Sequence, residues 1–133
     1  MDKFTKAKRS EIMAKIRSKD TIFERDFAVI LKKATRKKFQ MNVSTIKGKP
    51  DIVFAKKKVC IFLDSDFWHG WRYPRWKHIL NSFWKEKIED NRRRDKKTTA
   101  YLRKNGWTVL RFWEHEIATN PRKILKKVTK HLL

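Results

Sequence analysis

Five consecutive apolar residues, Val59 to Leu63, form the segment that most limits how this chain can fold. A strand with one face in water alternates apolar and polar residues, whereas a continuous apolar run is typical of a strand covered on both faces. We therefore expect a central strand at residues 59–63 with helices packed on both sides. The sequence contains no glycine-rich phosphate loop, internal repeat or low-complexity linker.

The apolar spacing on both sides of this run predicts the remaining elements. Short strands are expected at residues 39–43, 51–55 and 107–113, with turns around Gly48 and at Lys56-Lys57. Helices are expected over residues 21–36, from 81 or 82 to 104, and from Pro121 onward. The order helix, three strands, helix, strand, helix describes an α/β fold with a mixed central sheet flanked by helices.

Each predicted helix has a terminal signal. Thr21 and Glu24 have the spacing of a capping box, which would start the first helix. Asn105-Gly106 is a stop signal for the second, and Asn120 followed by proline is a start signal for the third. The signals support three separate helices.

The chain divides into a basic arm and one domain. Residues 1–20 contain few apolar side chains and are expected to form an arm or short helix, whereas residues 21–133 are long enough for one domain. Cys60 is the only cysteine, which fits a small core residue in a reducing compartment. No apolar run approaches the roughly 18 residues of a membrane span, and the first residues lack a secretion signal.

Charge favours nucleic acid as the partner. The formal net charge is +22, and 13% of the residues are aromatic, which is typical of a folded basic protein rather than a disordered tail. Fourteen Lys and Arg residues occur from Phe27 through Lys85, with Lys85 included, and the only acidic residues there interrupt or end apolar runs: Asp51, Asp64 and Asp66. Carboxylates in that setting suit Mg²⁺ ligands near phosphate, so the pattern predicts a metal-dependent nuclease.

Two of these carboxylates are expected to meet. Asp51 stands at the start of one predicted strand and Asp64 at the end of the next, and a cation between them would relieve their repulsion. The alternative for Asp51 is a simple turn after Gly48, which the pairing with Asp64 argues against. Asp66 would share a strand face with Asp64 if the strand continued.

His69 follows Asp64 by five residues and is a candidate general base for an attacking water, because its ordinary pKa lies near neutrality. A structural or surface histidine is the alternative. Asp95 interrupts the apolar stripe of the predicted long helix and needs a polar partner. We expect it to contact His69 or the water bound to the metal, the alternative being an ion pair with Arg92 or Arg94.

Several blocks of this sequence resemble the very-short-patch-repair (Vsr) endonucleases of the PD-(D/E)xK restriction-endonuclease-like superfamily. The blocks are Gly-Lys-Pro-Asp-Ile-Val-Phe at 48–54, Val-Cys-Ile-Phe-Leu-Asp-Ser-Asp-Phe-Trp-His-Gly at 59–70, Phe-Trp-Lys-Glu-Lys-Ile at 83–88, Asn91, Arg94-Asp95, Gly-Trp-Thr-Val-Leu at 106–110 and Trp-Glu at 113–114. The resemblance runs from Lys8 to Glu116 in order. It implies a restriction-endonuclease-like fold and a Mg²⁺-dependent DNA endonuclease.

The resemblance also implies individual roles. Asp51 is the principal Mg²⁺ ligand, helped by the main-chain carbonyl of Leu63, and His69 is the catalytic histidine with Asp95 near it. Glu24 takes a role in the site, besides or instead of its place in the capping box. Asp64, a further metal and catalytic candidate, stands at or next to the superfamily's lysine, which is absent here.

The residues expected to bind DNA fall into three groups. Phe67, Trp68 and Trp84 match the family's wedge beside a mispaired base, with core packing as the alternative for Trp84. Met13 and Ile16 match a clamp around DNA. The long helix contributes further candidates for phosphate contacts: Asn91, Arg92 and Arg93.

One departure concerns zinc. Vsr endonucleases commonly hold a structural Zn²⁺ through Cys and His, but the corresponding positions here are Asp66, Trp71, Tyr73 and His115. No thiolate is available among them, so we expect no zinc.

The sequence therefore predicts a Mg²⁺-dependent DNA endonuclease, and the resemblance implies that it is strand-specific and nicks at T:G mismatches. The alternatives are a nicking or restriction-like enzyme of different specificity and an inactive DNA-binding module. Expected partners are mismatched or distorted double-stranded DNA and mismatch-repair proteins, without a membrane. We expect a monomer in the bacterial cytoplasm, associated with the nucleoid.

Overall fold

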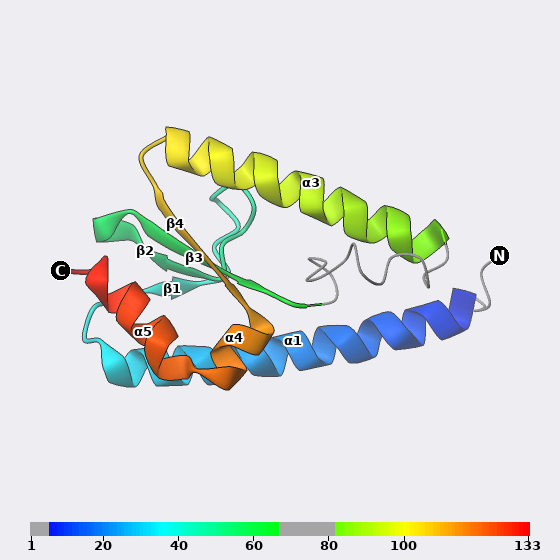
Figure 1. Ribbon diagram of the computed structural model, residues 1–133, viewed down its shortest axis with the longest axis horizontal. Coiled ribbons are helices and arrows are strands. Elements are labelled where there is room, and N and C mark those ends of the chain that lie inside the picture. Colours follow the sequence, from blue (N-terminus) through cyan, green and yellow to red (C-terminus); the bar gives the residue numbers. More distant parts are fainter. Residues whose placement is uncertain (1–5, 67–81) are drawn as a thin grey trace.

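A single sheet lies between two groups of helices (Figure 1). The computed structural model describes residues 6–66 and 82–133, with the main chain alone at residue 9 and at residues 16–21. Helix α3 (Ser82–Lys104) covers one face of the sheet. Helices α1 (Lys6–Ala34), α4 (Glu114–Thr119) and α5 (Pro121–Lys130) lie on the other. The expected α/β fold is confirmed.

The sheet has four strands in the order β1-β2-β3-β4. Strands β1 (Gln40–Met41), β2 (Ile52–Phe54) and β3 (Val59–Asp64) are antiparallel neighbours, and a short 3-10 helix, η1 (Ala55–Lys57), links β2 to β3. Strand β4 (Thr108–Trp113) pairs in parallel with β3. All six residues of β3 are buried, which confirms the central strand.

Side chains of β3 alternate between two apolar cores, as the period of a strand requires. Val59, Ile61 and Leu63 pack with residues of α1, α4 and α5. Cys60 and Phe62 pack on the other face with residues of β2, α3 and β4. Burial raises the pKa of the Cys60 thiol to about 11, so this cysteine is a protonated core residue, as expected.

The turn and cap signals before β2, after α3 and before α5 are confirmed. Lys49 N–H donates to the carbonyl of Ile46 at 3.0 Å, which closes a turn where Gly48 has a φ of +84°. Gly106 follows α3 with a φ of +87°, a conformation that glycine adopts without strain. The Asn120 side chain accepts a hydrogen bond from Lys123 N–H at 3.2 Å and caps α5.

The predicted start of the first helix is wrong. Helix α1 is continuous from Lys6 to Ala34, so Thr21 and Glu24 lie within it and form no capping box. Capping satisfies the free N–H groups of a first helical turn, and an interior turn has none. Neither Gly nor Pro occurs between Lys6 and Ala34, and Glu11 forms ion pairs with Lys8 and Lys15 at helical spacing.

Helix α4 was not predicted. It follows β4 directly, and the Glu116 carboxylate accepts the Trp113 N–H at 3.0 Å, which satisfies a donor at the helix start. Six residues are too few for a clear apolar period. Within residues 6–66 and 82–133, no helix combines the length and apolar character needed to cross a membrane.

Candidate active site

A pocket of about 480 Å³ opens at the edge of the sheet where β2 begins and β3 ends. Five different parts of the fold supply its charged lining: Glu24 from α1, Asp51 before β2, Asp64 from β3, Asp95 from α3 and Arg111 from β4. The four carboxylates were all predicted from the sequence as site residues. The fold brings them together, as expected for Asp51 and Asp64.

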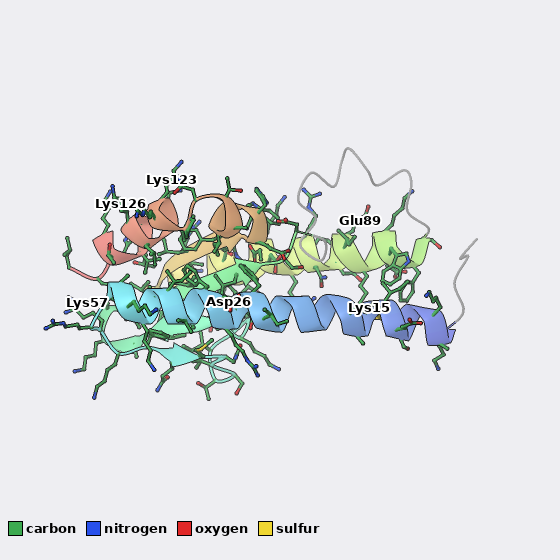
Figure 2. The ribbon with its side chains drawn as sticks, turned by 90° about the horizontal axis from the view of Figure 1, so that it is seen from below. Lys15, Asp26, Lys57, Glu89, Lys123 and Lys126 are labelled. Carbon is green, nitrogen blue, oxygen red and sulfur yellow. The ribbon has the colours of Figure 1, made fainter. Side chains whose placement is uncertain are left out.

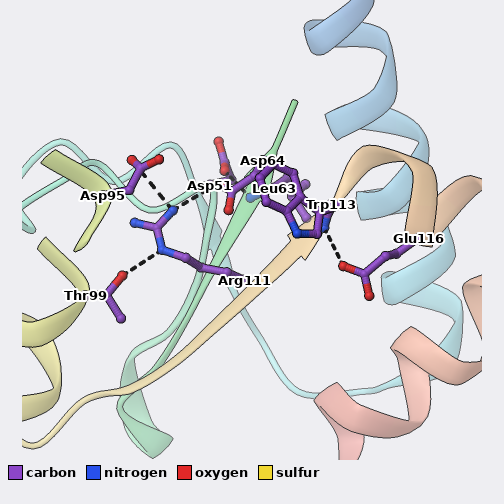
Figure 3. Close-up of polar contacts among 8 residues, drawn as sticks. All are labelled: Asp51, Leu63, Asp64, Asp95, Thr99, Arg111, Trp113 and Glu116. Carbon is purple, nitrogen blue, oxygen red and sulfur yellow. Dashed lines mark hydrogen bonds and ion pairs between the residues drawn. The ribbon is translucent and has the colours of Figure 1, made fainter. Parts of the chain in front are cut away.

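The main chain of Asp51 is held on both sides. Its N–H donates to the carbonyl of Ile61 and its carbonyl accepts from Asn42 N–H, both at 3.0 Å. Its carboxylate Oδ2 accepts the main-chain N–H of Leu63 at 2.6 Å (Figure 3). These bonds fix the half-buried carboxylate beside the end of β3, where it lines the pocket.

Leu63 reaches the pocket through its main chain. Its side chain packs in the core on the α1 side of the sheet, while the residue also lines the pocket together with Asp51. A main-chain oxygen beside a carboxylate is a common oxygen donor set for a divalent cation. The geometry is compatible with the predicted metal role of Leu63.

The loop before Asp51 approaches α3 closely. A Cβ placed on Gly48 would lie 2.4 Å from Thr98 Cγ2, and its positive φ also disfavours other residues. Thr98 is buried, and both residues line the pocket. The close contact sets the position of the segment that carries Asp51.

Asp64 is bound by Arg111, a residue that the sequence analysis missed. Arg111 Nη1 lies 2.9 Å from Asp64 Oδ1, and the two side chains are only 19% and 9% exposed. Register places Arg111 opposite Phe62, and its guanidinium stacks on the Phe62 ring at 4.1 Å. The available signal was a charged residue within an apolar strand. The sequence analysis applied this signal to the carboxylates but not to Arg111.

Asp95 also faces Arg111. Its Oδ1 lies 3.8 Å from Arg111 Nη1, and the neighbouring Thr99 accepts a hydrogen bond from Arg111 Nε at 2.7 Å (Figure 3). The sequence analysis did not consider Arg111 as a partner of Asp95. The expected contact between Asp95 and His69 lies outside the described residues.

Glu24 lines the pocket from α1 and is half-buried. Because Glu24 lies in the interior of a continuous helix, the capping alternative is wrong. A site role remains the prediction for Glu24.

Asp66 leaves the strand. Strand β3 ends at Asp64, and Asp66 Oδ1 lies 2.8 Å from His115 Nδ1 in α4. Asp64 and Asp66 thus contact different elements. Because the strand does not continue to Asp66, the two residues do not share a strand face. Two of the positions considered for zinc are in contact, while Trp71 and Tyr73 lie outside the described residues. The absence of zinc stays a prediction.

The residues predicted to bind DNA differ in burial and in their contacts, where the structure describes them. Trp84 is 4% exposed and packs edge-on against Phe83 at 4.8 Å, which favours the core alternative over the wedge. Arg93 pairs with Asp90, and Asn91 accepts a hydrogen bond from Arg94. Arg92 lines a second, basic pocket of about 430 Å³ between α3 and β4.

Met13 is half-buried in α1. The Ile16 side chain and all of Phe67, Trp68 and His69 lie outside what the structure describes. Their predicted roles are therefore untested by the fold.

Positive charge is spread over many elements rather than confined to the pocket. Figure 2 shows Lys15 on α1, Lys57 on η1, and Lys123 and Lys126 on α5. Such a distribution, in a chain of net charge +22, provides sequence-independent attraction to a polyanion.

Comparison with known proteins identifies the family of this chain. Residues 1–75 match the family model described as DNA mismatch endonuclease Vsr. The type II nicking enzyme V.HpaIIP of Haemophilus parainfluenzae is 38% identical over 98% of this chain and 94% of its own length. The chain belongs to the Vsr family.

Two further relatives support the assignment. The type II nicking enzyme V.NmeDIP of Neisseria meningitidis serogroup C is 37% identical over 96% of this chain and 88% of its own length. The DNA mismatch endonuclease Vsr of Escherichia coli K12 is 33% identical over 85% of this chain and 73% of its own length. Vsr family membership makes this chain a DNA endonuclease, and the pocket with four carboxylates is its candidate active site.

Proposed function

We propose that this protein is a Mg²⁺-dependent nickase that hydrolyses one strand of mismatched or distorted duplex DNA. The observation that carries the proposal is the Asp51 carboxylate, held 2.6 Å from the Leu63 N–H in a pocket with three further carboxylates. Lys49, Arg94 and Arg111 line the same pocket and supply cationic charge for a phosphate.

The donor set fits Mg²⁺ better than a softer metal. Within the described residues, no three His, Cys, Asp or Glu side chains converge as a complete metal site. Mg²⁺ commonly takes one or two carboxylates and retains waters, which suits Asp51 with the Leu63 carbonyl and Asp64 close by. Bound Mg²⁺ supplies Lewis-acid polarisation of the phosphate.

We assign the proton transfer to His69. A histidine accepts a proton from water near neutral pH, and proton transfer to such a base contributes roughly 10²–10⁴-fold to the rate. Asp95 is assigned as its orienting partner, and Glu24 as a further carboxylate of the site. Both side chains line the pocket around Asp51, which supports their roles.

Strand specificity follows from one site on one chain, since a monomer presents a single catalytic pocket to the duplex. Phe67 and Trp68 are the candidate wedge, because a mispaired base costs less to unstack. Met13, Ile16, Arg92 and Arg93 are assigned to the surrounding DNA contacts. We place this activity in the bacterial cytoplasm, at the nucleoid and alongside mismatch-repair proteins.

A specificity other than T:G is the second candidate. Two of the relatives described above are named as type II nicking enzymes, and the third as a mismatch endonuclease. A net charge of +22 also raises affinity for any duplex. Nicking at distorted or matched sites is therefore a separate outcome of the test.

The test uses duplexes labelled on either strand, one set matched and the other carrying a T:G mismatch, with Mg²⁺ or EDTA. We expect one labelled strand of the mismatched duplex to be cut, only with Mg²⁺. Equal cutting of matched duplex would favour the second candidate. Cleavage in EDTA, or of both strands at once, would reject the proposal.

A further inference from the structure

The basic pocket between α3 and β4 lies directly beside the candidate active site. Its volume is about 430 Å³. Three residues line both pockets: Asp64, Asp95 and Arg111. Arg111 lies 2.9 Å from Asp64 and 3.8 Å from Asp95, so these three side chains form a shared wall (Figure 3). A ligand that fills one pocket therefore lies next to the other.

The two pockets differ in charge. Among the described residues, four carboxylates and three cations line the candidate active site, so negative charge is in excess there. The basic pocket is lined by two carboxylates, both in the shared wall, and by four cations, again counted within residues 6–66 and 82–133. The candidate active site thus suits a cation, whereas the basic pocket suits an anion.

The cations outside the shared wall come from one face of α3. Arg92, Lys96 and Arg103 line the basic pocket together with Thr99, and residues spaced by three or four positions share a helix face. Arg103 Nη2 donates to the main-chain carbonyl of Val109 in β4 at 3.2 Å, which holds its guanidinium toward the strand. Lys96 is exposed. A positioned guanidinium and an accessible ammonium are the side-chain groups that commonly bind phosphate.

The shared wall favours a phosphate of the same strand as the anion. Successive phosphates of one strand are ~3.4 Å apart along the duplex axis, whereas the opposite strand lies across a groove roughly 6–12 Å wide. Only one layer of side chains separates the two pockets. A strand with its scissile phosphate in the candidate active site therefore brings a flanking phosphate to the basic pocket.

We propose that the basic pocket binds the phosphate that flanks the scissile one on the cleaved strand, with Lys96 and Arg103 as ligands beside Arg92. The inference rests on the proposed function and deepens it, because it defines the path of the cleaved strand. That path runs from Asp51 on one side of Arg111 to Lys96 on the other.

The experiment pairs the loss of a protein charge with the loss of one phosphate charge. It uses a duplex that the unaltered chain nicks in Mg²⁺, remade as a set in which a neutral methylphosphonate replaces each phosphate around the scissile one, on either strand. Single-turnover cleavage is measured at limiting protein concentration. Neutralising the flanking phosphate should slow the unaltered chain roughly tenfold, as expected for the loss of one charge-assisted hydrogen bond.

The double variant Lys96→Gln/Arg103→Gln should cleave the unmodified duplex more slowly and should lose most of the methylphosphonate penalty, to less than about threefold. Lys96→Gln alone should lose part of the penalty, and it decides the question if the double variant fails to fold, because Lys96 is exposed. The matched control is Lys123→Gln/Lys126→Gln, which removes the same charge from α5 on the other face of the sheet (Figure 2). The control should keep the full penalty.

The inference is overturned by the full penalty in the folded double variant, or by its absence in the unaltered chain. Coupling to a phosphate of the uncut strand would also overturn it, because the shared wall requires the flanking phosphate. An equal loss of the penalty in the α5 control would make total charge the cause and reject the site. If the unaltered chain nicks no unmodified duplex, the proposed function fails and the inference fails with it.

Discussion

The two faces of β3 differ at one end. On the face toward α1 and α5, Val59, Ile61 and Leu63 are all buried in one apolar core. On the face toward α3, Cys60 and Phe62 are also buried, but the next position on that face is Asp64. The change from apolar to charged coincides with the pocket. One face therefore lies wholly within an apolar core, whereas the end of the other lines the candidate active site.

Asp51→Asn, in the pocket at the charged end of β3, is expected to have the largest effect. Because the variant loses a charged oxygen donor but keeps the size of the side chain, cleavage should be abolished while the melting temperature changes little. DNA binding should stay similar or tighten, since one negative charge near phosphate is removed. A gel assay with labelled duplex measures both. Mg²⁺-dependent cleavage at the original rate would show that Asp51 is no part of the site.

His69→Ala tests the proposed base. It should lower the single-turnover cleavage rate by roughly 10²–10⁴-fold, the usual contribution of general acid-base catalysis, with the protein still folded. Thermal unfolding followed by circular dichroism provides the control. If the melting temperature falls in proportion to the activity, His69 is a structural residue.

Ile61→Ala should affect stability instead of chemistry. Ile61 is 0% exposed, and deleting its outer atoms should lower the free energy of unfolding by about 2–5 kcal/mol. The rate per folded molecule should stay near its original value at low temperature. Ile22→Ala is the matched control, because Ile22 is 59% exposed on α1 and should lose less than about 0.5 kcal/mol. Equal losses at both positions would contradict the assigned core.

Gly48→Ala addresses the contact between the site loop and α3. The new Cβ would stand 2.4 Å from Thr98 Cγ2 at a positive φ, so we expect a loss of about 1–3 kcal/mol and lower activity. Adding Thr98→Ser removes the clashing methyl and should recover part of the stability. Urea unfolding of both variants measures this recovery. No recovery would assign the whole cost to the backbone conformation.

The smallest effect concerns Cys60, which lies on the α3 face before the charged end. Since burial raises the pKa of its thiol to about 11, the folded chain should react with iodoacetamide at pH 8 far more slowly than the urea-unfolded chain. Mass spectrometry of the labelled protein measures the difference. Rapid labelling of the folded chain would mean that the α3 face is open to solvent along its whole length.

Local patterns predicted most of the fold. The strands at 52–54, 59–64 and 108–113 and the helix α3 lie where apolar spacing and the Asn105-Gly106 signal placed them. The start of α1 was mispredicted because the capping-box pattern is local, while the continuity of a helix depends on its neighbouring turns. The six-residue α4 was missed because one and a half turns carry little periodic signal.

The sequence by itself determined the strand order along the chain, the buried character of β3 and the carboxylates that gather in the pocket. Periodicity, turn chemistry and acidic residues in a basic chain are visible without coordinates. Only the tertiary structure decided the partner of Asp64. Arg111 lies 47 residues away in the chain, and the parallel register of β3 and β4 places it opposite Phe62, within reach of Asp64. Strand register depends on packing across the whole sheet, so no local pattern could reveal this pair.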